Sequence, residues 1–305
     1  MRHEFHCFDS RDFLGIFFSM RRPFLPLLCF VLLSQGCIQQ IAIRTMADIM
    51  DYGFDAYYQE TDLMFAREGL AGNMKILEAL IQGDPANRQL LLLGSQGYSA
   101  YALAFAEDDS VERARVFYLR GREYGLRVLR EHQALAASIG ADLETFERAL
   151  NALPNDEIPA VFWTAFAWGG YINISRTDLD AFADLPKVIA MMQFVTERDP
   201  GYYYGGAFLF LGAIEGTTPA MLGGKPERAK EHFEKALALN KGKFLLTYTY
   251  YAQTYAVQVQ DQELFERCLK TVEDASLDIL PEARLPNAVA KNKAKILRQR
   301  MPELF

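Results

Sequence analysis

Residues 84–118 read DPANRQLLLLGSQGYSAYALAFAEDDSVERARVFY, and residues 199–233 read DPGYYYGGAFLFLGAIEGTTPAMLGGKPERAKEHF. The two stretches lie 115 positions apart and align without a gap. Both begin with Asp-Pro, carry a glycine at the same place (Gly97 and Gly212), and end with Glu-Arg-Ala and then an aromatic residue. A duplication bounded by helix-terminating signals indicates a helical repeat protein, a class that usually works by presenting a binding surface.

The duplicated stretches fit the tetratricopeptide pattern. In that pattern small residues let two helices approach, and large residues fill the space between neighbouring helix pairs. The internal duplication covers about 73–125 and 188–240. A degenerate unit begins at Trp163, and a further unit follows the second copy, with Thr249 and Ala252 in its first helix. Strand signals are scarce along the whole chain.

A basic amphipathic helix over about 285–300 is expected to cap the repeats. Its basic side chains are expected on a solvated face rather than in a lipid-binding patch: Lys291, Lys293, Lys295 and Arg298. The sequence therefore predicts an all-α fold, with irregular tetratricopeptide-like helix-pair repeats forming a curved array. The alternative is an unrelated helical bundle.

The N-terminal segment has the pattern of an export signal. Arg21 and Arg22 precede an apolar run from Phe24 to Leu33. This run is too short to cross a bilayer core of roughly 30 Å as a helix. We therefore interpret residues 1–36 as a signal peptide (1–19 as a mis-called start before Met20) and residues 37–305 as a single domain.

Gly36 and Cys37 resemble a bacterial lipobox, in which the cysteine is acylated and becomes the mature N-terminus. Ser34 stands where such sequences usually have leucine, so the alternative is an ordinary secretory signal cleaved near Gly36. Acylation of Cys37 would add about 0.8 kcal/mol of membrane affinity for each buried CH₂. Cys268 then remains as a lone cysteine, which we expect to be a small buried apolar residue.

Composition argues against nucleic acid as a partner and against catalysis. The formal net charge is −7, and without the first 36 residues it is −8, from 28 basic and 36 acidic groups. A basic stripe that would bind phosphates is absent from the sequence. The two histidines after Cys37, His132 and His232, lack the spacing of metal ligands. We expect no cofactor, no metal and no catalytic residue.

The better candidates for binding lie on the inner faces of the predicted first helices. In stacked tetratricopeptide units, positions 2, 5, 9 and 12 of the first helix line the concave groove. Hydroxyl-bearing and aromatic groups on one groove suit a peptide or an amphipathic small molecule, although the aromatic residues could instead pack between helices. The candidates are Gln96, Ser99, Leu103, Thr164, Trp168, Tyr171, Thr247, Tyr250, Thr254 and Gln258.

Several longer runs resemble a known family. They are the runs at 158–170 (IPAVFWTAFAWGG), 199–206 (DPGYYYGG) and 221–233 (MLGGKPERAKEHF). Together they resemble the T-component of tetratricopeptide-protein-associated TRAP transporters, over roughly 37–300. Residue by residue, the resemblance carries over Cys37 and the segment from Trp163 to Trp168.

The resemblance implies a periplasmic lipoprotein that forms trimers, with a cavity or pore through each protomer. It also implies binding to the periplasmic solute-binding protein of the transporter and an apolar organic acid as ligand. We therefore expect a non-catalytic periplasmic accessory protein held by its lipid alone to a bacterial membrane, the outer one in preference to the inner. The alternative is a lipid-anchored scaffold for envelope assembly without a small-molecule ligand.

Overall fold

The computed structural model describes the backbone of residues 24–175, 178–217 and 225–305, and the side chains of these ranges from residue 40 onward. The first part of the predicted signal peptide, the side chain of Cys37 and the Gly223-Gly224 turn lie outside the described residues. Two compact units comprise residues 1–46 and 47–305. Every described element is a helix, which confirms the all-α fold class.

Helix α2 (Phe24–Tyr58) is followed by α3 (Leu63–Gly83) and α4 (Arg88–Tyr101). Asp62 caps α3 by accepting hydrogen bonds from the amides of Met64 and Phe65 at 2.9 and 3.1 Å. Helix α3 ends at the predicted Gly-Asp-Pro signal, because proline cannot supply the next helical amide. Asn87 caps α4 in the same way, so local sequence defines both helix ends.

The two copies of the duplication form two helix pairs. The first is α4 with α6 (Val111–Leu129), and the second is α12 (Tyr202–Thr217) with α13 (Pro226–Asn240); the helices of each pair pack extensively on each other. The equivalent residues Tyr118 and Phe233 are both fully buried. The duplicated sequence therefore corresponds to a duplicated helix pair, while the curved array of repeats stays a prediction.

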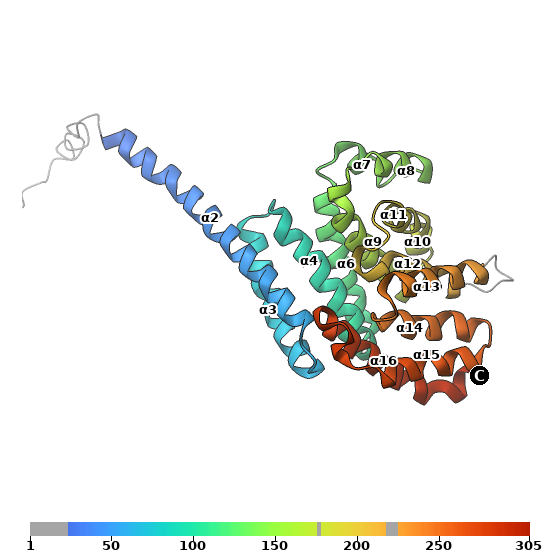
Figure 1. Cartoon of the computed structure of the whole chain (residues 1–305). Coiled ribbons are helices and arrows are strands. Elements are labelled where there is room, and N and C mark those ends of the chain that lie inside the picture. The colour runs from blue at the N-terminus through green and yellow to red at the C-terminus, as the bar shows by residue number, and fades with distance from the viewer. Residues whose placement is uncertain (1–23, 176–177, 218–224) are drawn as a thin grey trace, which may run out of the picture. The chain divides into compact units, whose positions relative to one another are not determined.

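Helix α9 (Ile158–Ile174) lies at the centre of the unit formed by residues 47–305. Together with α6 it lies between the α3–α4 pair and helices α11 to α13, as Figure 1 shows. Eleven of its residues are buried, as expected for a helix that is apolar on all sides. The flanking elements are α7 (Gln133–Ser138), α8 (Leu143–Asn151), η2 (Asn155–Glu157), α10 (Leu179–Ala183) and α11 (Leu185–Arg198).

The C-terminal part contains α14 (Leu246–Tyr250), η4 (Tyr251–Ala256), α15 (Gln262–Asp274) and α16 (Arg284–Leu304). Helix α16 packs against α14, α15 and α3. The expectation of a solvated basic face is wrong for Lys293, which is 8% exposed because it turns toward α5 (Glu107–Asp109) and pairs with acidic groups there. Cys268 is buried, as the sequence predicts. The short turns are α5 (Glu107–Asp109), η1 (Ala102–Ala106), η5 (Leu277–Ile279) and η6 (Pro281–Ala283).

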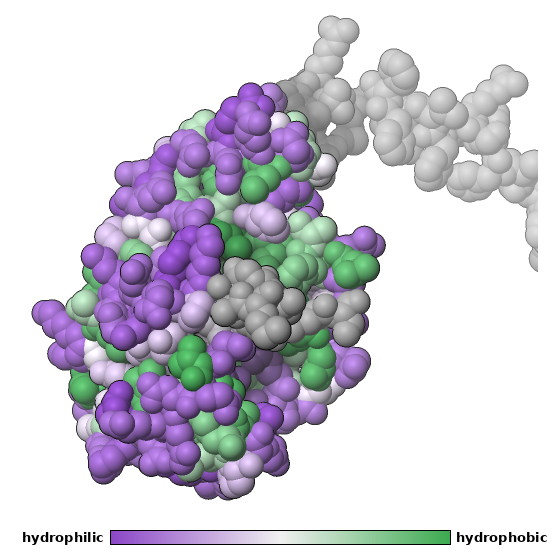
Figure 2. Space-filling view, turned by 90° about the vertical axis from the view of Figure 1, so that its right-hand side faces the viewer, coloured by the Kyte–Doolittle hydropathy of each residue, from purple (hydrophilic) through white to green (hydrophobic). Residues whose placement is uncertain are grey.

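Hydrophilic residues cover most of the face shown in Figure 2, and hydrophobic residues form separate areas between them. Among the described parts of the chain, no helix combines the length and the apolar character needed to cross a membrane.

Phe233 tests whether the duplicated aromatic position supports the fold. Its ring is fully buried and stacks on Tyr251, with 4.7 Å between ring centroids. We expect Phe233→Ala to lower the free energy of unfolding by about 3–5 kcal/mol, since it leaves a cavity in a packed core. The matched control Phe182→Ala alters a residue that is 51% exposed. It should change the free energy of unfolding by less than about 0.5 kcal/mol. Urea denaturation, monitored by circular dichroism, measures the free energy of unfolding of both variants. Equal effects would contradict the prediction that Phe233 supports the fold.

Candidate functional site

A cavity of about 350 Å³ lies inside the unit of residues 47–305. Its volume is within the range of roughly 300–1,000 Å³ that is usual for small-molecule sites. The wall is mainly apolar and aromatic, and both copies of the duplication contribute to it. Elements from α2 to α16 supply the wall residues, among them Phe54, Leu70, Phe162, Trp163, Phe166, Leu209, Phe210, Ala213, Phe244, Leu246, Leu285 and Val289.

Aromatic rings in the wall rest directly on glycine backbone. A Cβ atom on Gly169 would overlap the ring of Phe210, and one on Gly170 would overlap the ring of Tyr118. Gly97 and Gly206 lie in the same way against Phe54 and Phe162, at 2.8 and 2.9 Å from the ring atoms to an added Cβ. All of these residues line the cavity. Glycine is therefore required where the rings that form the wall meet the helices.

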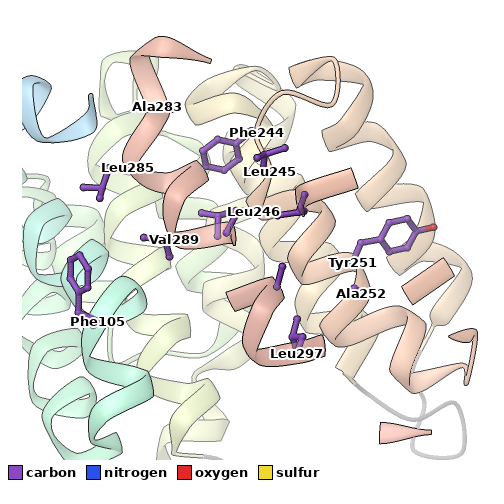
Figure 3. Packing of buried hydrophobic residues seen from close by; sticks show 14 of the residues in the cluster. Phe105, Phe244, Leu245, Leu246, Tyr251, Ala252, Ala283, Leu285, Val289 and Leu297 are labelled. Atoms are coloured by element: carbon purple, nitrogen blue, oxygen red, sulfur yellow. The ribbon is translucent and has the colours of Figure 1, made fainter. Parts of the chain in front are cut away.

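Two π-helical turns, η1 and η4, face the cavity. Leu103 and Phe105 of η1 and Thr254 of η4 line it. Such turns widen a helix by one residue and are frequent at functional sites. Figure 3 shows Phe105 on one side and Leu285 and Val289 of α16 on the other, all three in the wall. The wider turns thus bring additional side chains into the wall.

The backbone segment that brings Tyr203 into the wall is left-handed. Tyr203 (φ 46°), Tyr204 (φ 61°) and Gly205 (φ 75°) follow each other at the start of α12. For a residue other than glycine this conformation costs roughly 1–2 kcal/mol. Ring contacts offset the cost, because Tyr203 packs edge-on against Trp163 at 4.8 Å and Tyr204 stacks on Phe244 at 5.0 Å between centroids.

One cluster of wall residues is polar and neutral. Gln96 donates a hydrogen bond to the hydroxyl of Tyr58 (2.9 Å), which in turn lies 3.0 Å from the hydroxyl of Tyr203. Burial raises the pKa of both Tyr58 and Tyr203, so both phenols stay protonated at neutral pH. These three neutral side chains are thus linked by hydrogen bonds to one another.

The wall also contains a carboxylate, that of Glu107. Glu107 accepts a hydrogen bond from the hydroxyl of Tyr118 (2.6 Å) and lies 3.6 Å from Lys293 Nζ. Lys293 is shared, because its Nζ is also 3.6 Å from Asp108 Oδ1. Burial raises the pKa of Glu107 above its ordinary value of 4.5, against the opposing effects of Lys293 and Tyr118. Desolvation is therefore the dominant influence on this group.

Of the residues predicted to line a groove, four line this cavity: Gln96, Leu103, Tyr250 and Thr254. Three others are buried in helix contacts instead. Ser99 and Thr164 donate to the carbonyls of Ser95 and Ala160, at 2.5 and 2.6 Å, where helices α4, α6 and α9 meet closely. Thr247 accepts a hydrogen bond from Asn240 (3.2 Å).

The remaining candidates lie outside the cavity wall as well. Trp168 is 2% exposed, and Arg122 stands over its ring at 5.3 Å and over that of Tyr171 at 5.6 Å. Tyr171 also donates to Asp178 (3.3 Å), and Gln258 is half-buried on the turn after η4. As binding residues, the ten candidates stay a prediction.

Sequence reasoning missed Glu107, Tyr118, Tyr203 and Phe210 as wall residues. Glu107 begins an acidic run that reads as solvated surface, although Asp108 and Asp109 are the exposed members of it. Its position directly after the apolar run ALAFA was the available signal. For Tyr203 the signal was the triple-tyrosine run between glycines.

Two comparisons relate the chain to known proteins. The family model of the TRAP transporter T-component matches residues 59–305. The chain belongs to this family. It is also similar to a protein of Treponema pallidum (strain Nichols), described as an uncharacterised protein, with 21% identity over 321 residues that cover 94% of this chain and 99% of that protein. A T-component is an accessory of a TRAP transporter, and the family is one of transporter accessories rather than of known enzymes.

The raised pKa of Glu107 in this T-component has a consequence for stability. Because its folded-state pKa lies above the unfolded value, the folded protein holds this proton where the unfolded chain has lost it. The resulting stabilisation is complete below pH 4.5 and is lost as the pH rises through the folded-state pKa. We therefore consider the difference between the melting temperatures of Glu107→Gln and the wild type. We expect this difference to shift in favour of the variant as the pH rises from 4 to neutral.

Differential scanning fluorimetry measures this difference at each pH. Glu112→Gln, at an exposed position of α6, accounts for the general effect of removing a carboxylate. A difference that stays constant or decreases with pH would contradict a raised pKa.

Proposed function

We propose that this T-component is an exported, non-catalytic accessory protein that holds an apolar organic ligand in its cavity and binds the solute-binding protein of a TRAP transporter. Family membership supports the association with a TRAP transporter. The observation that carries the ligand-binding proposal is the aromatic cavity of about 350 Å³ inside the domain. Ligand binding and partner binding together would allow this protein to pass a ligand to or from the solute-binding protein.

The cavity has the character of a binding site rather than of a packing defect. Glycine contacts, π-helical turns and a left-handed segment are each costly or restrictive features, and each of them contributes residues to the wall. Backbone strain of this kind persists where surrounding structure enforces it, typically at functional sites. Aromatic and aliphatic side chains with a few polar groups suit an amphipathic organic molecule.

Export and anchoring belong to the same proposal. The support is the apolar run after Arg21 and Arg22 and the Gly36-Cys37 pair. We propose that the mature protein begins at Cys37, carries lipid on that residue, and acts in the periplasm at the outer membrane. Metabolic labelling with a clickable fatty acid, compared between wild type and Cys37→Ala, tests the anchor.

Filling the cavity should abolish ligand binding. Ala213 lines the wall on α12, and Ala213→Phe would place a ring in the open space. A ligand at about 100 times its Kd stabilises the folded protein by about 2.7 kcal/mol. We therefore expect a clear rise in melting temperature of the wild type with at least one member of a panel of medium-chain amphiphiles, and none with Ala213→Phe.

The matched control is Ala238→Phe, at an exposed position of α13, which should respond as the wild type does. If the wild type itself shows no response across the panel, the alternative of a scaffold without a small-molecule ligand is favoured.

The partner is tested separately from the ligand. We expect the mature protein to co-elute in size-exclusion chromatography with the solute-binding protein encoded beside it, and not with a solute-binding protein from an unrelated transporter. Multi-angle light scattering on the same column gives the oligomeric state, for which the family resemblance implies a trimer. Separate elution of the cognate pair would contradict the proposal.

A further inference from the structure

The charge of the cavity wall is set by a single residue. Among the wall residues within the described parts of the chain, Glu107 is the one that carries a formal charge, and the wall has no lysine, arginine or histidine. An ionised carboxylate of a ligand would therefore meet an acidic group and no cation in the wall itself. Like charges repel more strongly beside an apolar protein wall than in bulk water.

Lys293 does not neutralise Glu107 completely. Its Nζ lies 3.6 Å from both Glu107 and Asp108, so one cation serves two carboxylates. When both are ionised, the cluster has a net charge of −1. The distance is also longer than a normal N–H···O hydrogen bond. Its side chain is 9% exposed, and α16 presents it to α5 rather than to the cavity.

Glu107 retains free capacity to accept hydrogen bonds. The side chain is 20% exposed and lines the cavity. Its one short hydrogen bond is received from Tyr118 on Oε1, whereas a carboxylate has about four acceptor sites. Tyr250, a wall residue on α14, is the further ionisable group near this carboxylate, and burial raises the pKa of its phenol so that it stays neutral.

We propose that Glu107 receives the polar end of the ligand, and that this end is a hydrogen-bond donor, best an ammonium group on an apolar body. This inference rests on the ligand-binding function proposed above and specifies its chemistry. The cluster of Gln96, Tyr58 and Tyr203 does not select charge, because all three side chains are neutral. An organic acid fits Glu107 only while one of the two carboxyl groups keeps its proton.

The test compares decylamine, 1-decanol and decanoate, which share a ten-carbon chain and differ in the head group. Isothermal titration calorimetry on the mature protein at neutral pH gives each Kd. We expect decylamine to bind at least about tenfold more tightly than decanoate. Its ammonium group would donate a charge-assisted hydrogen bond to Glu107, whereas the carboxylate of decanoate would be repelled by it. Decanol should bind with intermediate affinity.

Two variants assign the effect to Glu107. Glu107→Gln should reduce the preference for decylamine over decanoate by about tenfold or more, while Glu112→Gln, exposed on α6, should leave it unchanged. Tyr118 can still donate to a glutamine oxygen and Lys293 keeps Asp108, so Glu107→Gln preserves the local contacts.

Each outcome is decisive. If decanoate binds the wild type as tightly as decylamine or more tightly, the inference is overturned and the ligand-binding function stands. A preference for the amine that persists unchanged in Glu107→Gln overturns the assignment to Glu107. If none of the three compounds binds the wild type, the failure is that of the proposed function itself. The wild-type ranking decides the question even if Glu107→Gln does not fold.

Discussion

The fold depends on aromatic rings that rest on glycine backbone. Where Phe210 meets Gly169 and Tyr118 meets Gly170, even a methyl group would overlap the ring. Glycine lets one edge of a large ring touch a helix, while the bulk of the ring keeps the neighbouring helices apart. A close-packed interior with few voids is the norm in proteins, so an internal space of about 350 Å³ needs rigid walls of this kind.

The pKa of the wall residue Glu107 results from two opposing electrostatic effects. Lys293 and the Tyr118 hydroxyl stabilise the ionised form of Glu107, and burial destabilises it. Burial wins, because Lys293 is shared with Asp108 and stands 3.6 Å away. The charge of the Glu107 carboxylate is thus incompletely neutralised. This is expected of a group that binds a ligand, and not of a purely structural ion pair.

The contrast with Glu157 supports this interpretation. Glu157 is also buried, yet Arg88 and His132 both contact it directly, the latter at 2.8 Å between Nε2 and Oε1. That carboxylate joins η2 to α4 and to the turn before α7, and none of the three residues lines the cavity. This T-component therefore contains both a structural acid, held by two partners, and an acid that faces open space.

The sequence by itself determined the features that depend on local or periodic patterns. The duplication at 84–118 and 199–233 predicted paired helices, Asp-Pro at 84–85 predicted where α3 ends, and the amphipathic pattern around Cys268 predicted its burial. The family resemblance at 158–170 and 221–233 lies within the match to the T-component family. These features can be predicted from the sequence, because helix ends and helix faces depend on residues that lie close together in the chain.

Only the tertiary structure decided which side chains enclose the cavity. Its wall combines residues from α2 to α16, and periodicity gives the face of one helix but not how neighbouring helices turn toward each other. Ser99 and Thr164 share the register of wall residues yet fill a close helix contact. The helical period predicts that the side chain of Lys293 is solvated, but in the structure it turns inward to Glu107 and Asp108. Charge and burial at such positions are properties of partners that lie far apart in the chain, which is why they appear only once the helices are packed.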